Sequence, residues 1–310
     1  MDEVVIEKRG VWARIALCAL HLHLPGLSML RMGKPRMATL MLAIPAVMFL
    51  LILASYAGGL RLTFYNFVVM FGCTVAVIIL VYFAGLIFTW NESGRARLPL
   101  KWWSRWYSLV VVDVVSLCFL LGMVNACHRY YHPYYMPSES MLPTITLKDN
   151  FYAKMHGKEP VKRGDVIILL TQGHDYIKRV AGIEGDHIGL KNGIVVLNGH
   201  AVMQQNFGKS QIQEDGHSVP VVELTEQFPG EVERHHIYSI GDSPSADDYP
   251  EVVVPPGHVF VLGDNRDRSA DSRFALEVDG TGMVARSDIE GKAQFIYWSA
   301  DHSRIGQTIH

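Results

Sequence analysis

The sequence predicts an N-terminal α-helical transmembrane region of about three spans, followed by a mainly β domain. Long uncharged runs fill the first part, whereas short runs rich in Val, Ile and aromatic residues fill the second. The charge also changes sign: residues 1–127 carry 11 Lys+Arg and 5 Asp+Glu, and residues 128–310 carry 17 and 25. This asymmetry excludes a single globular unit. It also excludes an ordinary nucleic-acid-binding protein, because no basic stripe accompanies the part that could fold in water.

Three apolar runs are long enough, at 1.5 Å per helical residue, to cross a hydrocarbon layer about 30 Å thick. They are residues 37–57, 62–90 and 107–127, which together define a transmembrane region at 37–127. The short connection around Gly58-Gly59 predicts that the first two spans form a hairpin. Asp113 interrupts the third span, and we expect its carboxylate to reach headgroup water or a neighbouring helix.

Basic residues predict the orientation of these spans. They gather before the first span and between the second and third, at Lys8, Arg9, Arg14, Arg31, Lys34, Arg36, Arg95, Arg97, Lys101 and Arg105. The N-terminus should therefore be cytoplasmic and the part after Cys127 extracytoplasmic. Residues 1–36 are predicted to be a cytoplasmic or interfacial segment. Within it, Val11–Leu30 is mostly apolar but carries His21 and His23, so we expect a short amphipathic helix at the interface, with a further span as the alternative.

Residues 128–310 are predicted to form the extracytoplasmic β-rich domain. The expected strands are Asp165–Leu170, Tyr176–Ile183, Gly193–Leu197, Val252–Val254, Val259–Leu262 and Ala293–Trp298. Asn192-Gly193 and Asn198-Gly199 predict tight turns on either side of a hairpin strand. No alternation of strands and helices supports a parallel sheet. The more polar stretch Gln204–Tyr249 is expected to be a variable excursion from the main sheet.

Cysteine and metal chemistry are not indicated in this domain. Cys18, Cys73, Cys118 and Cys127 all lie in or at the edge of the apolar part, so the β domain cannot hold an internal disulfide. His235-His236 lies near acidic residues, but without a third well-spaced ligand we interpret it as a solvated loop rather than a metal site. A GxSxG nucleophile motif is also missing from the sequence.

The segment Met136–Thr144 is the first of several chemically suggestive blocks. It contains Ser138 and Ser140 between two prolines, which restrict the backbone, and it follows the third span within about a dozen residues. Considered alone, it could equally be a rigid membrane-proximal turn. Three other blocks accompany it: Arg163-Gly164-Asp165 before a strand, Asp175–Gly182 with Lys178 inside an apolar β pattern, and the polar run Gly263–Arg273.

In this order and behind membrane spans, the blocks resemble those of bacterial type I signal peptidases, the Ser–Lys leader peptidases. The resemblance covers essentially the whole β domain, and it is weak over the spans and over residues 204–249. It implies a mainly antiparallel β catalytic domain with an extended β excursion. It further implies Ser140 as nucleophile, Lys178 as general base, and Ser138 with the Ser140 backbone N–H as oxyanion-hole donors. Supporting roles are implied for Ser269, which would orient the lysine, and for Asp264, Arg266, Asp271 and Arg273.

Lysine chemistry is consistent with these roles. An ordinary lysine has a pKa of about 10.4 and is protonated at neutral pH, so it cannot accept a proton from serine. Burial penalises the charged form and lowers the pKa of lysine by up to several units. Tyr176, Ile177 and Val180 supply apolar surroundings for Lys178. A neutral Lys178 could then take the proton of Ser140 and later pass it to the leaving amine.

Two positions depart from the pattern of the family. Glu139 stands between the two serines, where many relatives have Gly. A carboxylate directed into the site would stabilise the protonated lysine, so we expect Glu139 to point outward to water. Glu184 occupies a turn in which a proline is common, and we interpret it as a surface change. Neither departure removes a reacting group.

The sequence thus predicts a membrane-bound serine endopeptidase that cleaves N-terminal signal peptides from exported preproteins, at the outer face of a bacterial cytoplasmic membrane. Preproteins and the lipid bilayer are expected partners, the secretion translocon is a candidate partner, and no metal or organic cofactor is implied. Pro137, Met141, Tyr176 and Ile177 are predicted to line shallow pockets for small side chains beside an extended substrate. Two alternatives remain: a dedicated Ser–Lys maturation peptidase of a pilus or conjugation system, and a catalytically silent membrane-anchored binding protein.

Overall fold

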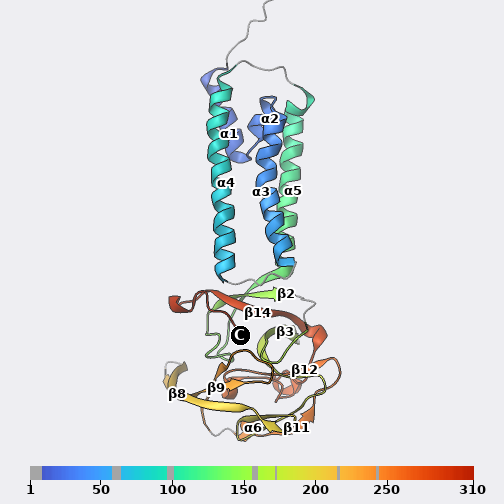
Figure 1. Ribbon diagram of the computed structural model, residues 1–310, viewed down its shortest axis with the longest axis vertical. Coiled ribbons are helices and arrows are strands. Elements are labelled where there is room, and N and C mark those ends of the chain that lie inside the picture. Colours follow the sequence, from blue (N-terminus) through green and yellow to red (C-terminus); the bar gives the residue numbers. More distant parts are fainter. Residues whose placement is uncertain are drawn as a thin grey trace, which may run out of the picture. The chain divides into compact units, whose positions relative to one another are not determined.

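The computed structural model of the chain divides into two compact units, residues 1–128 and 129–310 (Figure 1). The described residues are 9–57, 64–95, 101–155, 160–171, 173–214, 217–241 and 244–310. The turn predicted at Gly58-Gly59 lies outside them. The first unit is helical and the second is mainly antiparallel β, which confirms the predicted fold class.

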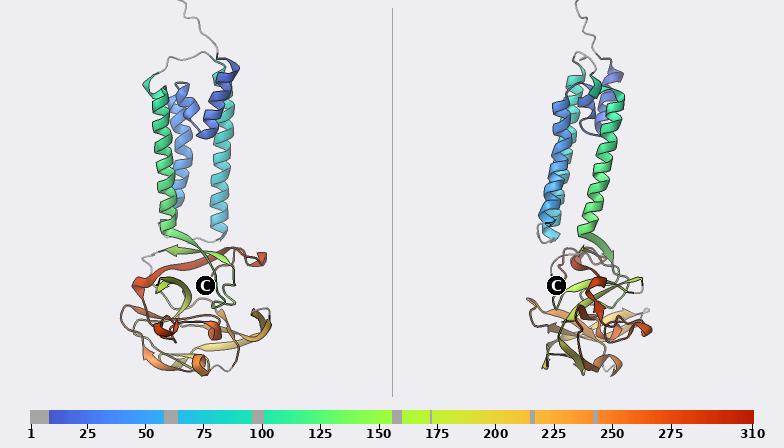
Figure 2. Two further views of the ribbon diagram at one scale, coloured as in Figure 1. Left: turned by 180° about the vertical axis from the view of Figure 1, so that it is seen from behind. Right: turned by 90° about the vertical axis from the view of Figure 1, so that its right-hand side faces the viewer.

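Three helices of the first unit are long and apolar enough to cross a membrane. They are α3 (Pro35–Ala57), α4 (Phe64–Ser93) and α5 (Trp106–Tyr130). Figure 2 shows that the axes of these three helices are nearly parallel within this unit. Their apolar side chains are largely exposed, as expected of surfaces that face lipid rather than a protein core. A short 3₁₀ turn at Trp102–Ser104 precedes α5.

The N-terminal segment contains a short helix where we expected one, and its place at the membrane interface stays a prediction. Helix α1 (Val11–His23) runs antiparallel along the second half of α4. At one end of the contact, Arg14 donates to the Trp90 carbonyl at 3.1 Å, and at the other end His21 Nε2 lies 3.1 Å from the Tyr82 carbonyl. Gly26, with φ of +99°, then turns the chain into α2 (Leu27–Arg31). The segment therefore folds back as a helical hairpin against α4.

Polar side chains of α1 and α2 contact other helices of this unit. His21 and Ser28 are both fully buried, and their Nδ1 and Oγ atoms lie 3.3 Å apart. Ser28 Oγ also lies 2.9 Å from Thr89 Oγ1 of α4. His23 pairs with Asp113 of α5 at 3.0 Å. The polar groups that made the segment a poor span thus find protein partners, as buried polar groups require.

The β unit contains three sheets, and all its paired strands are antiparallel among the described residues. The strands are β1 (Tyr131–Tyr135), β2 (Asn150–Met155), β3 (Val166–Thr171), β4 (His174–Ile183), β5 (His187–Lys191), β6 (Ile194–Leu197), β7 (His200–Ala201), β8 (Met203–Glu214), β9 (His217–Gln227), β10 (His235–Ser239), β11 (Tyr249–Val253), β12 (His258–Leu262), β13 (Val284–Ala285) and β14 (Ile289–Trp298). The main sheet has the order β1-β2-β14-β3-β4-β12-β13. In Figure 1, β2 and β14 lie at one end of this unit, and β11 and α6 (Pro244–Asp247) lie at the other.

The smaller sheets account for the turns and the excursion. A four-stranded sheet has the order β11-β5-β6-β7. Its two tight turns are built as expected, because Asn192 and Gly193, and likewise Asn198 and Gly199, have positive φ angles of 51°, 74°, 52° and 79°. The polar excursion at 204–249 forms a separate three-stranded sheet of order β10-β9-β8, followed by α6.

Candidate active site

The serine block, Met136–Thr144, follows β1 and contains two buried methionines. Met136 and Met141 are almost completely buried, and they anchor the segment on both sides of Ser138 and Ser140. The Met136 N–H donates to the Asp149 carbonyl at 2.9 Å, which holds the start of the segment against the end of the next loop. Ser140 is 7% exposed, whereas Ser138 is exposed. The two serine hydroxyl oxygens lie 3.2 Å apart.

Strand β4 brings Lys178 to Ser140. Lys178 lies opposite Ile167 of β3 in a central strand of the main sheet, within the buried run that continues to Gly182. It is 3% exposed. Its Nζ donates to Ser140 Oγ at 3.0 Å and to the Ile177 carbonyl at 3.1 Å. Two residues that are 38 positions apart in sequence are thus in hydrogen-bond contact in a site closed to bulk water.

The surroundings of Lys178 change its basicity. Burial lowers the pKa of Lys178 from its ordinary value to about 8. The carboxylates of Asp271 and Asp264 act in the opposite direction, and Arg273 adds a further small lowering. At pH 7, roughly a tenth of the lysine is then neutral. An amine in this state can accept a proton from the serine hydroxyl that it contacts.

The terminal block Gly263–Arg273 folds around its own buried ion pair. Arg273 contacts the Asp271 carboxylate through Nε at 2.9 Å and Nη2 at 2.8 Å. Burial alone would raise the pKa of Asp271, but the adjacent Arg273 charge and the Gly263 N–H lower it below its ordinary value. Arg273 also donates to the Arg266 carbonyl at 2.6 Å, which closes the block on itself. The block is therefore a rigid, charge-balanced support.

Asn265 joins this block to the nucleophile, a contact that the sequence analysis missed. The Asn265 N–H donates to the Ser140 carbonyl at 3.1 Å, and its side-chain amide donates to the Glu139 carbonyl at 3.1 Å. These bonds fix the two carbonyl groups that precede and follow the Cα atom of Ser140. The position of Asn265 inside the predicted polar block was the only signal available in the sequence.

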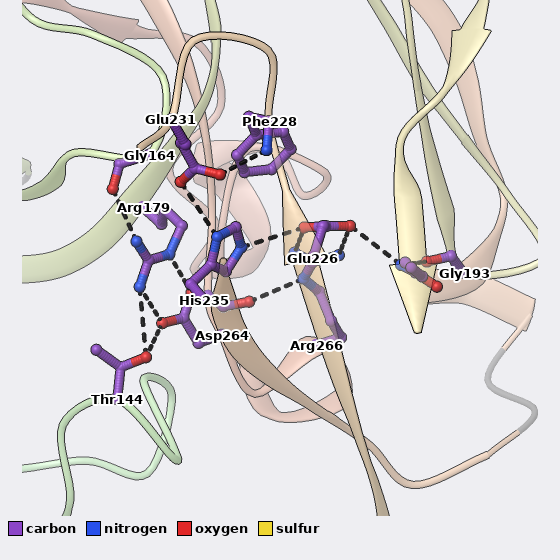
Figure 3. Close-up of polar contacts among 12 residues, drawn as sticks. Thr144, Gly164, Arg179, Gly193, Glu226, Phe228, Glu231, His235, Asp264 and Arg266 are labelled. Carbon is purple, nitrogen blue, oxygen red and sulfur yellow. Dashed lines mark hydrogen bonds and ion pairs between the residues drawn. The ribbon is translucent and has the colours of Figure 1, made fainter. Parts of the chain in front are cut away.

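A second ion pair joins the terminal block to the lysine strand, and Thr144 of the serine block binds to it (Figure 3). Arg179, the residue after Lys178, is fully buried. Its Nε and Nη2 donate hydrogen bonds to the two oxygens of the Asp264 carboxylate, both at 2.7 Å. Thr144 donates its hydroxyl to the same carboxylate. Arg179 Nη1 also donates to the Gly164 carbonyl at 2.7 Å, which brings in the Arg163-Gly164-Asp165 block. All four predicted blocks therefore meet within one network of contacts.

Ser269 lies beside this network, but the structure gives it a different contact from the expected one. Its hydroxyl is buried and has no hydrogen-bond partner among the described residues. It packs on Gly263, where an added Cβ would lie 2.1 Å from Ser269 Oγ. Lys178 instead donates to Ser140 and to the Ile177 carbonyl. A role for Ser269 in orienting the lysine stays a prediction.

The other predicted site residues occupy three kinds of environment. Pro137 is exposed, and Tyr176 is partly exposed with its ring centroid 5.7 Å from Lys178 Nζ. Met141 and Ile177 are buried in one core cluster, and each is next in sequence to a residue of the proposed dyad. Glu139 is partly exposed. Glu184 is exposed and accepts a hydrogen bond from the Gly257 N–H at 2.8 Å.

The expectation that His235-His236 forms a solvated loop was wrong. Both residues lie in strand β10, and His235 is 5% exposed. The strand pairs with β9, the preceding strand in the sequence, and the local polar composition did not reveal this pairing. Among the described residues, no group of three or more His, Cys, Asp or Glu side chains is arranged to hold a metal ion.

Comparison with known proteins identifies the family. The model of the family "Signal peptidase, peptidase S26" matches residues 105–298. The chain belongs to this family. It is 26% identical over 203 residues to signal peptidase I of Bacillus amyloliquefaciens, covering 64% of this chain and 90% of the relative. It is 31% identical over 198 residues to signal peptidase I of Bacillus caldolyticus, covering 63% and 90%. A crystal structure of a signal peptidase I from Enterococcus faecalis V583 matches at 23% identity, over 44% of this chain and 98% of that chain, with a TM-score of 0.25.

The resemblance drawn from the motif blocks is thus confirmed: the chain is a signal peptidase of the bacterial type I group. Membership of this group supports cleavage of signal peptides from preproteins by a serine peptidase. The matched region contains Ser140, Lys178 and the terminal block.

Proposed function

We propose that this S26 signal peptidase is a membrane-bound endopeptidase that uses Ser140 as nucleophile and Lys178 as general base. The observation that carries the proposal is the 3.0 Å contact between Lys178 Nζ and Ser140 Oγ in a buried site. Such a distance allows direct proton transfer, and burial supplies the neutral amine that the transfer needs. Histidine, the more common base for a serine nucleophile, makes no contact with Ser140 among the contacts of the described residues.

In the first step, neutral Lys178 takes the hydroxyl proton of Ser140 as Oγ attacks the scissile carbonyl carbon. The negative charge that develops on the carbonyl oxygen needs fixed donors. The Ser140 backbone N–H and the Ser138 hydroxyl are available for this, since Ser138 Oγ lies 3.2 Å from the nucleophile. The Lys178 ammonium then returns its proton to the leaving amine, and the peptide C–N bond breaks to leave an acyl ester on Ser140.

In the second step, Lys178, neutral again, removes a proton from a water molecule that attacks the ester. The tetrahedral intermediate collapses, the C–O bond to Ser140 breaks, and Oγ recovers a proton from Lys178. The contacts between Arg179 and Asp264 hold Lys178 and Ser140 within hydrogen-bond distance of each other during both steps. The preference for small side chains before the cut follows from the family resemblance, with Pro137 and Tyr176 exposed enough to contact substrate.

We further propose that the chain is a multi-pass protein of a bacterial cytoplasmic membrane, with its N-terminus in the cytoplasm and the β unit outside. The basic residues before α3 and between α4 and α5 support this orientation. The bilayer surrounds α3, α4 and α5, and preproteins reach the β unit on the outer face. The secretion translocon is the candidate neighbour that would deliver them.

The direct test is to incubate the purified full chain, in detergent or liposomes, with a preprotein that carries an Ala-x-Ala cleavage site. The proposal predicts one cut after the second alanine, identified by mass spectrometry of both products, and no cut by Ser140→Ala. Persistence of the cut in a folded Ser140→Ala variant would exclude Ser140 as nucleophile. If the folded wild-type chain bound preproteins without cutting them, it would be the silent binding protein instead.

A further inference from the structure

Asn265 of the terminal block holds both carbonyl groups that flank the Cα atom of Ser140. Its side-chain Nδ2 donates to the Glu139 carbonyl at 3.1 Å, and its backbone N–H donates to the Ser140 carbonyl at 3.1 Å. Asn265 is completely buried. One residue of a distant block therefore fixes the backbone of the nucleophile through both its side chain and its main chain.

The Glu139–Ser140 peptide unit connects this contact to the chemistry. The Glu139 carbonyl and the Ser140 N–H belong to one planar trans peptide unit, in which they point in opposite directions. The Glu139 carbonyl also accepts a hydrogen bond from the Leu142 N–H at 3.1 Å, which closes a turn with Ser140 at its second position. Two donors on the carbonyl therefore fix the direction of the N–H at the other end of the unit.

The Ser140 N–H is the open end of this peptide unit. The other polar groups of Ser140 are engaged, because Oγ accepts from Lys178 and the carbonyl accepts from Asn265. Among the described residues, no oxygen accepts a hydrogen bond from the Ser140 N–H. This N–H is thus available to a group that the substrate brings, as an oxyanion donor must be.

Buried ion pairs on either side hold Asn265 itself in place. The preceding residue, Asp264, pairs with Arg179 at 2.7 Å, and the following residue, Arg266, pairs with Glu226. All four of these charged side chains are at most 5% exposed. The amide of Asn265 is therefore fixed before substrate binds, and a donor that is fixed in advance needs no reorganisation during the reaction.

We propose that Asn265 is a positioning residue for oxyanion stabilisation: its side-chain amide holds the Glu139–Ser140 peptide unit so that the Ser140 N–H points at the carbonyl oxygen of the bond being cut. This inference rests on the proposed function of Ser140 and Lys178. It gives an uncharged residue of the terminal block a part in the reaction, distinct from the ion pairs of its two neighbours.

Asn265→Ala should slow the chemical step. The variant keeps the backbone N–H that contacts the Ser140 carbonyl but loses the amide that holds Glu139, so the Ser140 N–H can turn away from the developing charge. We expect kcat to fall about ten- to hundredfold with KM little changed, because a misdirected donor costs less than an absent one. The pH at which kcat/KM rises should stay at its wild-type value, since the charges that act on Lys178 are unchanged.

The fold should tolerate this substitution. The Glu139 carbonyl keeps its bond from the Leu142 N–H, so no buried acceptor loses its last donor. The Asn265 Oδ1 atom, which has no hydrogen-bond partner among the described residues, is removed together with the amide. We therefore expect only a small decrease in Tm. A purely structural role would instead lower Tm strongly and raise KM together with the fall in kcat.

Asn150→Ala is the matched control. Asn150 Nδ2 also donates to a backbone carbonyl at 3.1 Å, that of Lys148, but this carbonyl lies outside the serine block. Its loss should leave kcat unchanged. Asn265→Asp is a second variant, which keeps the size of the side chain but offers no donor to Glu139. Its kcat should fall as in Asn265→Ala when both are compared at pH 10, where most of Lys178 is neutral in either variant.

Two peptide probes test the oxyanion itself without any cleavage. A peptide aldehyde adds to Ser140: the Oγ–C bond forms, the C=O double bond becomes single, and the serine proton passes to Lys178, which leaves an oxyanion. The same peptide with the scissile amide reduced to CH₂–NH has no carbonyl oxygen to stabilise. Titration calorimetry of the full chain in detergent should show that Asn265→Ala binds the aldehyde about ten- to hundredfold more weakly than wild type does. The reduced peptide should bind both equally.

Parallel losses in kcat and in aldehyde affinity, with KM and the pH profile unchanged, support the proposal. Equal kcat in Asn265→Ala and Asn150→Ala contradicts it, and so does an equal loss of affinity for the two probes. If Asn265→Ala does not fold, Asn265→Asp decides: a kcat at pH 10 equal to that of wild type contradicts the proposal, and a loss confined to kcat and aldehyde binding supports it.

The aldehyde also separates this inference from the proposed function. If Ser140→Ala binds the aldehyde as tightly as wild type does, Ser140 is not the nucleophile and the proposed function fails. If Ser140→Ala weakens binding of the aldehyde and Asn265→Ala does not, the dyad stands and only the role of Asn265 is wrong.

Discussion

Gly263 lies so close to Ser269 that a Cβ atom at position 263 would be 2.1 Å from Ser269 Oγ. The same atom would be 2.6 Å from the Ser140 carbonyl oxygen. The backbone of the terminal block thus touches the backbone of the nucleophile, and only a residue without a side chain permits this approach. The Gly263 N–H also donates to Asp271 at 3.0 Å, so the position of the glycine is fixed from both sides.

Replacing this glycine should separate the block from the nucleophile. In Gly263→Ala, the methyl group must displace either Ser269 or the Ser140 carbonyl, and we expect kcat to fall by about a hundredfold, because a displacement of about 1 Å is enough for such a loss. Gly182→Ala is the comparison, since its Cβ would meet only side-chain atoms, at 3.3 Å or more. Steady-state cleavage by both variants checks the prediction. Equal activities in the two would show that the close approach does not matter for catalysis.

The two serines of the site should respond differently to substitution. Ser140→Ala should abolish cleavage, because the covalent bond cannot form. Ser138→Ala should retain turnover reduced by roughly two to three orders of magnitude, because only one of the two oxyanion donors is lost. Single-turnover cleavage of a preprotein measures both. Background rates in both variants, with the fold intact by circular dichroism, would contradict the division of roles.

Burial of Lys178 should cost stability in a pH-dependent way. Its pKa is about 8 in the folded chain and 10.5 in the unfolded chain, so between these values the unfolded state binds more protons and stability rises with pH. Lys178→Met removes this cost, which is roughly 3 kcal/mol at pH 7. The variant should melt at a higher temperature than wild type at pH 7, and the difference should shrink by pH 10. A difference in Tm that does not change with pH would contradict the buried, weakly basic lysine.

The proposed topology can be tested by reporter fusions. A periplasmic reporter fused at Gly199 should be active, and a cytoplasmic reporter fused within residues 101–105 should be active as well. The basic residues around these spans are the physical reason. A cytoplasmic location for Gly199 would leave the peptidase without access to exported substrates and would overturn the orientation.

The proposed dyad was predicted from the resemblance of the four blocks to a family, because a lysine in an apolar strand and a serine between prolines do not by themselves indicate catalysis. The turns at Asn192-Gly193 and Asn198-Gly199 were readable, because their backbone conformations demand these residue types. The three membrane-spanning helices could be predicted from the length and apolar composition of their runs.

The rest depends on partners that a single sequence does not show. His235 lies opposite Glu226 in a three-stranded sheet whose strands alternate little in polarity, so its local composition resembled that of a loop. The packing of α1 and α2 involves Thr89 and Asp113, which lie on other helices.

The central claim is that neutral Lys178 takes the proton of Ser140, and the most direct measurement is cleavage by Lys178→Arg compared with the pH profile of wild type. Arginine keeps the positive charge but cannot give up a proton in the accessible pH range. The account predicts that kcat/KM of wild type rises with pH through about 8, and that folded Lys178→Arg is as inactive as Lys178→Ala. Substantial cleavage by Lys178→Arg, or a wild-type profile that is flat between pH 6 and pH 10, would contradict the Ser–Lys mechanism.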